Sequence, residues 1–212
     1  MYLSLNDSGI TIETLARSAC GTISGTSDGS LTAYGISIDS RTTKKADAFI
    51  ALKGDKFDGH DFLSDAAKAG AVFAVVDHVP ENCPLPCVVV ENTTRALGKI
   101  AHAYKQLFRT ISVAVTGSVG KTTTKQFIYS VLDTKYKTNE THGNFNNEIG
   151  LPLTIFKIRA KHEVAVLEMG ISDFGEMHRL AAMARPDIGV ITNIGLCHLE
   201  NLGTRDGILQ AK

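Results

Sequence analysis

The stretch ISVAVTGSVGKTTTKQF, residues 111–127, constrains the fold of this chain more than any other segment. A run rich in β-branched residues ends at Thr116, and two glycines, a lysine and three threonines follow before a helical pattern begins. Glycines let backbone N–H groups approach a cluster of negative charges, and the helix that follows adds its positive N-terminal end. The order of strand, glycine turn and helix therefore predicts a phosphate-binding loop.

The lysine and the hydroxyl after the glycines indicate a nucleotide with magnesium. Lys121 can place a point charge on the outer phosphates, and the Thr122 hydroxyl can ligate Mg²⁺. The standard pattern has a glycine five positions before Gly120, where this chain has Val115, so the loop is a variant. A glycine turn that only closes a strand–helix connection would need neither the lysine nor the threonine. The residues predicted to bind the nucleotide are Gly117, Ser118, Val119, Gly120, Lys121, Thr122 and Thr123.

Strands and helices alternate along the second half of the chain. This alternation predicts parallel βαβ units, in which ligands bind at the carboxyl ends of the strands. The expected segments are strands at 111–116, 163–170 and 187–195 and helices at 121–133 and 174–184.

Two polar residues fall at this same edge of the predicted sheet. Glu168 ends an apolar strand, where a carboxylate can hold Mg²⁺ directly or through water. His198 lies on the loop after the last strand. A single histidine is more often a packing or surface residue, but its place beside Lys121 and Glu168 favours a metal-binding role.

The first part of the chain has the pattern of a smaller α/β unit. Gly70 is placed to end one helix, and Asn92 or Thr93 is placed to begin the next. We expect the domain boundary at this second helix, with domains of residues 1–91 and 92–212. The expected segments are strands at 34–40, 47–54, 71–76 and 87–90 and helices at 60–70 and 92–108.

Composition narrows the classes of protein further. The 22 basic and 22 acidic residues cancel, so no charge excess suggests a nucleic-acid or membrane-surface partner. No apolar run approaches the roughly 20 residues of a membrane span, and the N-terminus lacks the pattern of a signal peptide. The four cysteines lack zinc-site spacing, and we expect them to be reduced in a cytoplasmic protein.

The motifs together resemble one enzyme family. TGSVGKTTTK, NFNNEIGLPLT, EMGISDFGEMHRLAAMARPDIGVITNIGLCHLE and the closing AK are similar to segments of the Mur ligases, the ATP-dependent amide-bond-forming enzymes of peptidoglycan precursor synthesis. The family's own loop pattern, T-G-[ST]-x-G-K-T, accounts for Val115. The resemblance implies an α/β chain, in which a small N-terminal UDP-sugar-binding domain precedes the first half of a P-loop-type parallel-sheet ATPase domain.

The resemblance assigns roles to residues at matching positions. Catalytic roles fall on Lys121, Glu168, His198 and Lys212, with Thr122, Glu168 and His198 as metal ligands. Lys212 stands fourteen positions after His198 and matches a lysine whose carbamate holds a second Mg²⁺. An unmodified ammonium group could not ligate a cation. The residues expected to bind substrate are Ser40, Arg41, Lys53, Asn144, Asn146 and Asn147, although Ser40 and Arg41 also fit a turn with a salt bridge.

The resemblance also implies a reaction. ATP and Mg²⁺ are the expected cofactors, and UDP-N-acetylmuramoyl-tripeptide and D-alanyl-D-alanine are the expected substrates of a monomeric enzyme. The peptide carboxylate attacks the γ-phosphate to give an acyl phosphate, and the amine of the dipeptide then displaces phosphate. The family also has a C-terminal domain that this chain lacks, so we expect the 212 residues alone to be a fragment with little or no ligase activity.

Other functions remain open from the sequence. The chain could belong to a related ligase, either one that adds the third peptide residue or a folate polyglutamylating enzyme. The latter usually has glycine–lysine–glycine–serine where this chain has GKTT. A nucleotide-binding module or switch without ligase chemistry would need no NFNNEIGLP segment and no lysine placed like Lys212.

Overall fold

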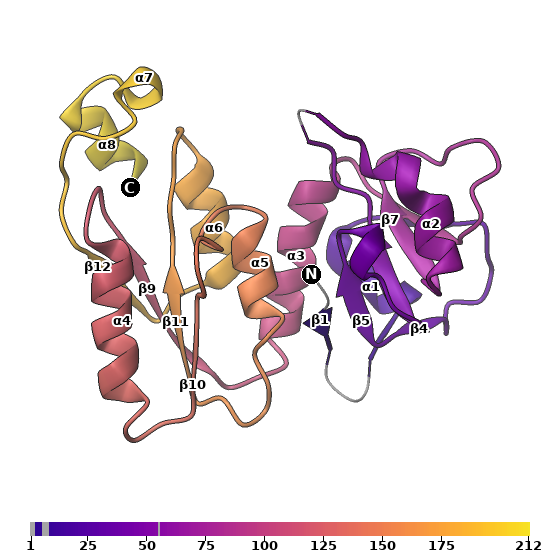
Figure 1. Cartoon of the computed structure of the whole chain (residues 1–212), viewed down its shortest axis with the longest axis horizontal. Helices are drawn as coiled ribbons and strands as arrows, with labels where there is room; N and C mark the ends of the chain where they lie inside the picture. The colour runs from indigo at the N-terminus through magenta and orange to yellow at the C-terminus, as the bar shows by residue number, and fades with distance from the viewer. Residues whose placement is uncertain (1–2, 6–8, 55) are drawn as a thin grey trace. The chain divides into compact units, whose positions relative to one another are not determined.

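The computed structural model describes residues 3–5, 9–54 and 56–212 (Figure 1). The chain forms two compact units, residues 1–100 and 101–212. The division falls inside α3 (Thr93–Lys105), which Asn92 caps by accepting a hydrogen bond from Arg95 N at 2.9 Å. The boundary expected between residues 91 and 92 lies just before this helix and remains a prediction.

The first unit is built on a sheet of mixed direction. Its elements are β1 (Leu3–Ser4), β2 (Ile10–Thr11), α1 (Ile12–Ala19), β3 (Thr22–Ser24), β4 (Thr32–Ala33), β5 (Gly35–Ser37), η1 (Ser40–Thr42), β6 (Asp47–Ile50), η2 (Gly59–Phe62), α2 (Leu63–Lys68), β7 (Phe73–Val76) and β8 (Cys87–Val89). The strand order is β1-β5-β6-β7-β8-β3, with β2 and β4 paired separately. The inner strands β5 to β8 are parallel, and the two edge strands are antiparallel to them.

The inner strands of this sheet are buried on both faces. All four residues of β6 and all four of β7 are buried. Central parallel strands have this character, which explains why they appear in the sequence as short apolar runs. The strands expected at 34–40 and 47–54 are shorter in the structure, because each chain segment leaves the sheet at the carboxyl edge.

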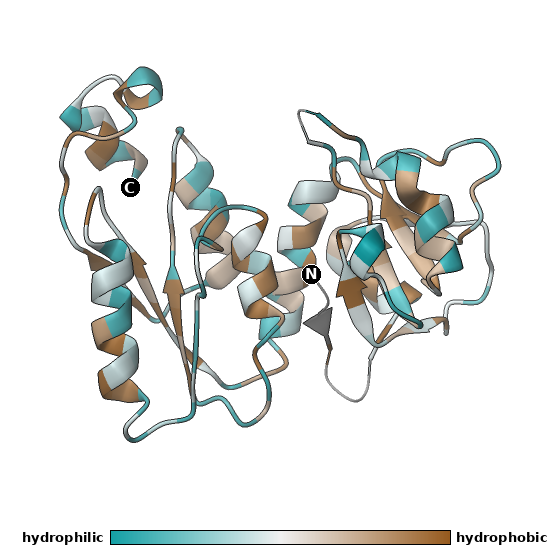
Figure 2. Cartoon of the chain, in the orientation of Figure 1, coloured by the Kyte–Doolittle hydropathy of each residue, from teal (hydrophilic) through white to brown (hydrophobic). Residues whose placement is uncertain are grey.

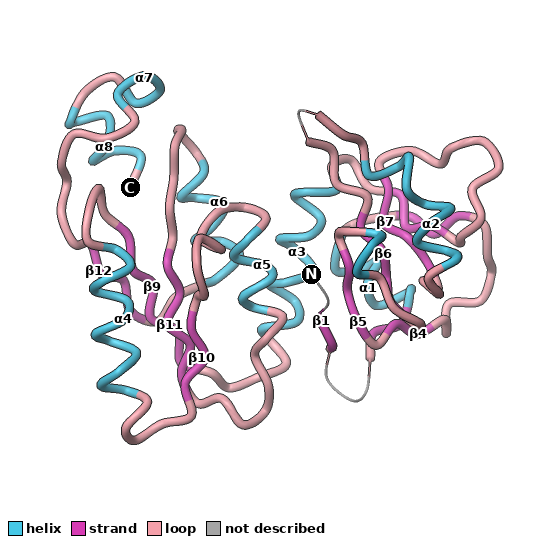
Figure 3. Tube along the Cα trace, in the orientation of Figure 1, coloured by secondary structure: helices cyan, strands magenta, loops and turns pink. Residues whose placement is uncertain are grey.

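The second unit is a parallel α/β layer structure. Its elements are β9 (Ile111–Thr116), α4 (Lys121–Leu132), β10 (Thr138–Glu140), α5 (Gly150–Ile155), β11 (Val164–Glu168), α6 (Glu176–Ala184), β12 (Ile188–Ile191), α7 (Leu199–Leu202) and α8 (Arg205–Ala211). The strand order is β10-β11-β9-β12, and every pairing is parallel. The α/β class expected from the sequence is confirmed. Figure 3 shows loops leading from the strand ends into the helices.

Packing against the sheet fixes the position of α4. The side chains of Val113, Val115, Val164 and Val166 lie on one face of β9 and β11 and pack against Ile128, Tyr129, Leu132 and Tyr136 of α4 and its extension. Figure 2 shows the hydrophobic colour of these strands. The helix begins directly at Lys121, so this contact also fixes where the phosphate loop ends. Among the described residues, no helix is long and apolar enough to cross a membrane.

Candidate active site

The loop between β9 and α4 has a backbone that only glycine adopts without strain. Gly117 has φ +142°, and a Cβ atom there would lie 1.9 Å from Oγ1 of Thr192. Gly120 has φ +78° and immediately precedes the first residue of α4. Glycine has no Cβ and accepts positive φ at little steric cost. The predicted glycine turn is therefore present, and it leads directly into the N-terminus of a helix.

The loop is held by the segment that follows β12. Ser118 N donates to the carbonyl oxygen of Asn193, and Val119 N donates to Asn193 Oδ1, each at 3.1 Å. The Ser118 hydroxyl donates to the Gly195 carbonyl at 2.9 Å and accepts from Gly195 N at 3.0 Å. The Thr192 hydroxyl donates to the carbonyl of Val119 at 2.6 Å. Asn193 is a site residue that the sequence analysis missed, since a side chain bonded to a distant loop leaves no local pattern.

The lysine of the loop lies across the loop itself. Lys121 Nζ donates to the carbonyl oxygen of Gly117 at 2.9 Å and to that of Ser118 at 3.4 Å. The first N–H groups of α4, at Lys121, Thr122 and Thr123, have no acceptor within the helix, because a helix leaves its first donors unpaired. The lysine charge and these donors together form a site for an anion.

The carboxylate at the end of β11 has one oxygen in use and one without a partner. Glu168 is 2% exposed, and its Oε1 accepts a hydrogen bond from Asn146 Nδ2 at 2.8 Å. Within the described residues, Glu168 Oε2 is buried with no hydrogen-bond partner, and so is the hydroxyl of Thr116 at the end of β9. A buried oxygen without a donor is costly, and a divalent cation or its water satisfies it. The donor set therefore fits Mg²⁺.

A buried ion pair lies next to the segment that hydrogen-bonds to the Glu168 backbone. Lys125 Nζ donates to Glu140 Oε2 at 2.6 Å and to the Thr141 carbonyl at 2.8 Å. The Thr141 hydroxyl in turn accepts from Glu168 N at 3.0 Å. These contacts join α4, β10 and β11 at the edge where the phosphate loop begins. The sequence analysis did not assign a role to Lys125 or Glu140.

Lys212 lies within electrostatic reach of the phosphate loop. Burial lowers the pKa of its amine, Cys197 opposes that effect, and the positive charge of Lys121 lowers the pKa further. Figure 1 shows the C-terminal end of the chain at the edge of the sheet where α4 begins. Two neighbouring lysines favour an anion between them.

His198 is placed by the turn before α7 and keeps an exposed ring. It has φ +50°, its side chain is 41% exposed, and its Nδ1 lies 3.8 Å from Oε1 of Glu200. Among the described residues, this carboxylate is the ion-pair partner of His198. A metal role for His198 therefore remains a prediction.

The three asparagines expected near the substrate differ in their contacts. Asn146 bonds Glu168, as described above. Asn147 Oδ1 accepts from Gly150 N at 2.8 Å and from Ile149 N at 3.2 Å, so it caps the start of α5. Asn144 is exposed, and its carbonyl accepts from Asn146 N at 2.8 Å. Their contacts with a substrate remain predictions.

In the first unit, the expected UDP-sugar residues lie in a turn with an ion pair. Arg41 Nη2 donates to Asp39 Oδ2 at 2.7 Å, and this pairing lowers the pKa of Asp39 to about 2. Ser40 begins η1 beside it. Lys53 pairs with Asp58, with Nζ 3.8 Å from Oδ2. The turn and salt bridge that the sequence left open are present, and a substrate role for the exposed Arg41 remains a prediction.

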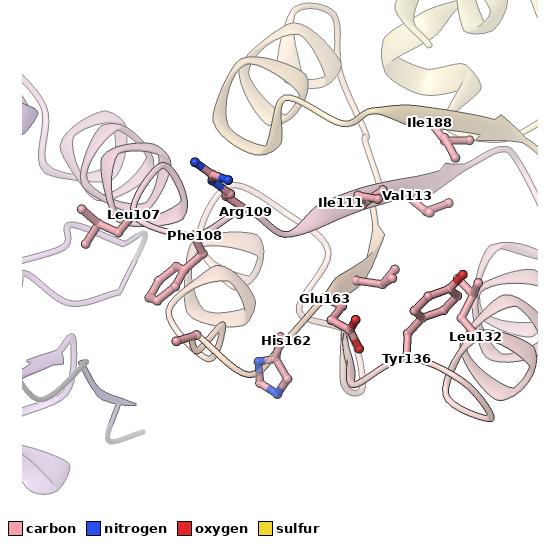
Figure 4. A pocket seen from close by; sticks show the side chains of 12 residues that line it. Leu107, Phe108, Arg109, Ile111, Val113, Leu132, Tyr136, His162, Glu163 and Ile188 are labelled. Atoms are coloured by element: carbon pink, nitrogen blue, oxygen red, sulfur yellow. The ribbon is translucent and has the colours of Figure 1, made fainter.

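A cavity of about 650 Å³ lies in the second unit, away from these residues (Figure 4). Ile111, Val164 and Ile188 line it, and these residues begin β9, β11 and β12. The phosphate loop follows the other end of β9. The cavity is therefore at the opposite edge of the sheet and takes no part in the candidate site.

Two family models match the chain. The Mur ligase family catalytic domain matches residues 32–105, and the Mur ligase middle domain matches residues 115–212. The phosphate loop, Glu168, His198 and Lys212 all fall within the second match.

Curated relatives agree with these matches. The chain is 43% identical over 204 residues to the UDP-N-acetylmuramoyl-tripeptide–D-alanyl-D-alanine ligase of Bacillus subtilis, covering 95% of this chain and 45% of that protein. It is 35% identical over 182 residues to the protein of the same name from Escherichia coli, covering 86% of this chain and 40% of that one. The chain thus spans less than half the length of these relatives.

Solved structures share the fold. A crystal structure of MurF from Acinetobacter baumannii matches with a TM-score of 0.88 and 34% identity, over 99% of this chain and 46% of that one. MurF ligase from Thermotoga maritima in complex with ADP matches with a TM-score of 0.78 and 38% identity, over 83% of this chain and 41% of that one. These matches in sequence and in fold show that the chain belongs to the Mur ligase family.

Proposed function

We propose that this chain supplies the UDP-sugar-binding part and the ATP-binding loop of a ligase that joins D-alanyl-D-alanine to UDP-N-acetylmuramoyl-tripeptide. The observation that supports this most directly is the unpartnered Oε2 of Glu168, buried at the edge where the 117–120 loop meets α4. A metal–nucleotide complex needs both features side by side. The names of the curated relatives supply the two substrates.

In the proposed reaction, the chain's own residues bind and orient the nucleotide. The tripeptide carboxylate attacks the γ-phosphate of ATP and forms an acyl phosphate with release of ADP. Lys121 and the free N–H groups at the start of α4 neutralise charge on the transferring phosphoryl group, which is mainly an electrostatic task. The amine of D-alanyl-D-alanine then attacks the acyl carbon, and phosphate leaves.

Thr122, Glu168, His198 and carbamylated Lys212 are the residues that would hold magnesium. When bound, Mg²⁺ neutralises phosphate charge and aligns the phosphoryl group. Asn146 fixes the orientation of Glu168 through its hydrogen bond. Lowering of the Lys212 pKa by burial increases the fraction of neutral amine, which is the form that reacts with carbon dioxide.

The first unit is proposed to bind the UDP-sugar. Ser40, Arg41 and Lys53 carry this role, because Arg41 and Lys53 present exposed cationic side chains that suit a diphosphate. Both ATP and a UDP-linked precursor are cytoplasmic metabolites, so the proposed site of action is the cytoplasm.

A chimera tests the proposal. Residues 1–212 replace the matching part of the B. subtilis relative, and phosphate release is measured with ATP, UDP-N-acetylmuramoyl-tripeptide and D-alanyl-D-alanine. We expect release that depends on both the tripeptide and the dipeptide, and its loss in Lys121→Ala. A parallel assay offers UDP-N-acetylmuramoyl-dipeptide with a single amino acid.

The outcomes separate the alternatives. Turnover only in the parallel assay would assign the chain to third-residue addition. A folded chimera that binds ADP but releases no phosphate in either assay would indicate that the chain is a nucleotide-binding module without ligase chemistry.

A further inference from the structure

The end of β7 and the turn η2 bring together a second group of metal-ligand side chains. His60, Asp77 and His78 each offer one ligand atom, and these atoms all lie within 4.8 Å of one another. All three belong to the first unit and take no part in the phosphate loop. We propose that they form a binding site for a divalent transition metal of the zinc type.

His60 is already oriented as a metal-bound histidine would be. Its side chain is 4% exposed, and its Nδ1 lies 2.5 Å from Oδ1 of Asp58. Asp58 also accepts from His60 N at 2.9 Å, so the carboxylate is fixed on that side of the ring. A carboxylate on one ring nitrogen sets the tautomer and leaves the other nitrogen as a ligand, the arrangement that accompanies most metal-bound imidazoles.

The second nitrogen of His60 faces another acceptor. His60 Nε2 lies 3.2 Å from Oδ1 of Asp77, and that same oxygen lies 2.5 Å from Nδ1 of His78. With the proton of His60 on Nδ1, Nε2 is unprotonated and accepts a long hydrogen bond from Asp77 N at 3.2 Å. This bond uses the single lone pair of Nε2, and the Asp77 carboxylate oxygen lies beside that lone pair with no proton between them. A cation bound here would replace the hydrogen bond and contact both Nε2 and the Asp77 oxygen.

The donor set selects the class of metal. Two imidazoles and one carboxylate suit zinc and its neighbours, whereas magnesium and calcium prefer oxygen ligands. Ligand atoms around a four-coordinate zinc lie about 3.4 Å apart for bonds of about 2.1 Å. The His78 ring now stacks on His60 with centroids 4.4 Å apart, and it has to turn to complete the site. Its side chain is 62% exposed, so this rotation is free of core packing.

The fourth position of the site is open to solvent. Asp77 and His78 are partly or largely exposed, so a water molecule or an external ligand can complete the coordination. Asp58 also pairs with Lys53, so the carboxylate that orients His60 is itself held by a second contact.

Zinc binding to the 212-residue chain tests the site. The chain is titrated with Zn²⁺ against a chromophoric chelator, in excess Mg²⁺ to fill oxygen-rich sites, and with Co²⁺ to record the ligand-field spectrum. We expect one equivalent of Zn²⁺ and a Co²⁺ spectrum of nitrogen and oxygen ligands. His78→Ala and Asp77→Asn should each abolish that equivalent, and Asp58→Asn should weaken it by about 10- to 100-fold.

Matched controls separate this site from other ligands. His178→Ala removes an exposed histidine from α6, and it should leave zinc affinity unchanged. Cys83→Ser tests the thiol pair Cys83 and Cys87, whose sulfurs lie 3.4 Å apart, and it should also leave affinity unchanged. Because His78 is exposed, circular dichroism should show its variant to be folded.

Three results would overturn the proposal. The first is that the chain binds no equivalent of Zn²⁺. The second is that folded His78→Ala and the parent chain bind zinc with equal affinity. The third is a Co²⁺ spectrum with sulfur charge-transfer bands that Cys83→Ser removes. None of these readouts depends on nucleotide or ligase chemistry, so the proposed function stands or falls separately.

Discussion

Asn146 donates a 2.8 Å hydrogen bond to Oε1 of Glu168 and thereby turns the second carboxylate oxygen, Oε2, toward a buried position without a partner. Asn146 lies on the segment between β10 and α5, whereas Glu168 ends β11. The amide therefore orients a carboxylate that the sheet alone would leave free to rotate. Side chains that hydrogen-bond to metal ligands commonly have this orienting role.

Replacing this amide should weaken magnesium-dependent nucleotide binding. Asn146→Ala is expected to lower the affinity of the chain for ADP in the presence of Mg²⁺ by about 10- to 100-fold, because Glu168 loses its fixed orientation. Calorimetric titration with and without Mg²⁺ measures the effect. Gln106→Ala, which removes an exposed amide just after α3, is the control. Equal Mg²⁺ dependence in Asn146→Ala and the control would show that Glu168 does not serve the metal.

Removing the loop lysine should separate binding from stability. Lys121 Nζ bonds two carbonyl oxygens of its own loop and, among the described residues, no charged partner, so Lys121→Ala should change the free energy of unfolding by less than about 1 kcal/mol. Loss of its charge should nevertheless abolish measurable ADP binding. Calorimetry and urea unfolding report the two quantities, with exposed Lys161→Ala as the control. Near-normal ADP affinity in Lys121→Ala would place the phosphates elsewhere.

Two glycines of the same loop should differ in their tolerance of alanine. A Cβ at Gly120 meets nothing within 4 Å, so Gly120→Ala should cost only the strain of positive φ, about 1–2 kcal/mol. A Cβ at Gly117 meets Oγ1 of Thr192 at 1.9 Å, so Gly117→Ala should distort the loop and abolish ADP binding. The double variant Gly117→Ala/Thr192→Ala removes the clashing hydroxyl and should recover part of the affinity. No recovery would mean that backbone strain, not the clash, decides the effect.

The phosphate loop could be predicted from sequence because its determinants are local. Glycines, a lysine and a threonine in fixed order need no distant partner to be recognised, and the strands around them are apolar runs. The same reasoning predicted that Asn92 or Thr93 caps the next helix, and the hydrogen bond from Arg95 N shows that Asn92 is the cap.

Features that depend on distant contacts were not predicted. In the sequence, Lys125 looks like an ordinary helix lysine beside three threonines. In the structure it is only 4% exposed, because Glu140 on β10 forms an ion pair with it. Three further elements were missed for local reasons. The short β10 and α5 have three and six residues, which carry too little periodicity to detect. The helix α1 was missed although Ile12, Leu15 and Ala19 follow helical spacing.

Removing only one charge of the buried pair Lys125 and Glu140 should lower the free energy of unfolding more than removing both. Lys125→Met leaves an unpaired carboxylate in a buried position, and it should lower the free energy of unfolding by about 3–5 kcal/mol. The double variant Lys125→Met/Glu140→Leu removes both charges and should recover most of that loss. Urea unfolding of the two single variants and the double variant gives the coupling. Additive losses would show that the two residues act independently.

Cysteine reactivity should follow burial. Burial, with a smaller contribution from the hydrogen bond with Cys83, raises the pKa of the Cys87 thiol to about 12. The thiolate is the reactive form, so iodoacetamide at pH 8 should label exposed Cys20 and spare Cys87 until urea unfolds the chain. An unfolded thiol ionises near pH 8.5 and the folded one only near 12, so the unfolded state releases its proton first. The stabilising contribution of Cys87 is therefore complete below about pH 8.5 and should be lost progressively toward pH 12. Urea unfolding across this range, compared with Cys87→Ala, measures the slope, and identical pH dependence in both proteins would contradict the assignment.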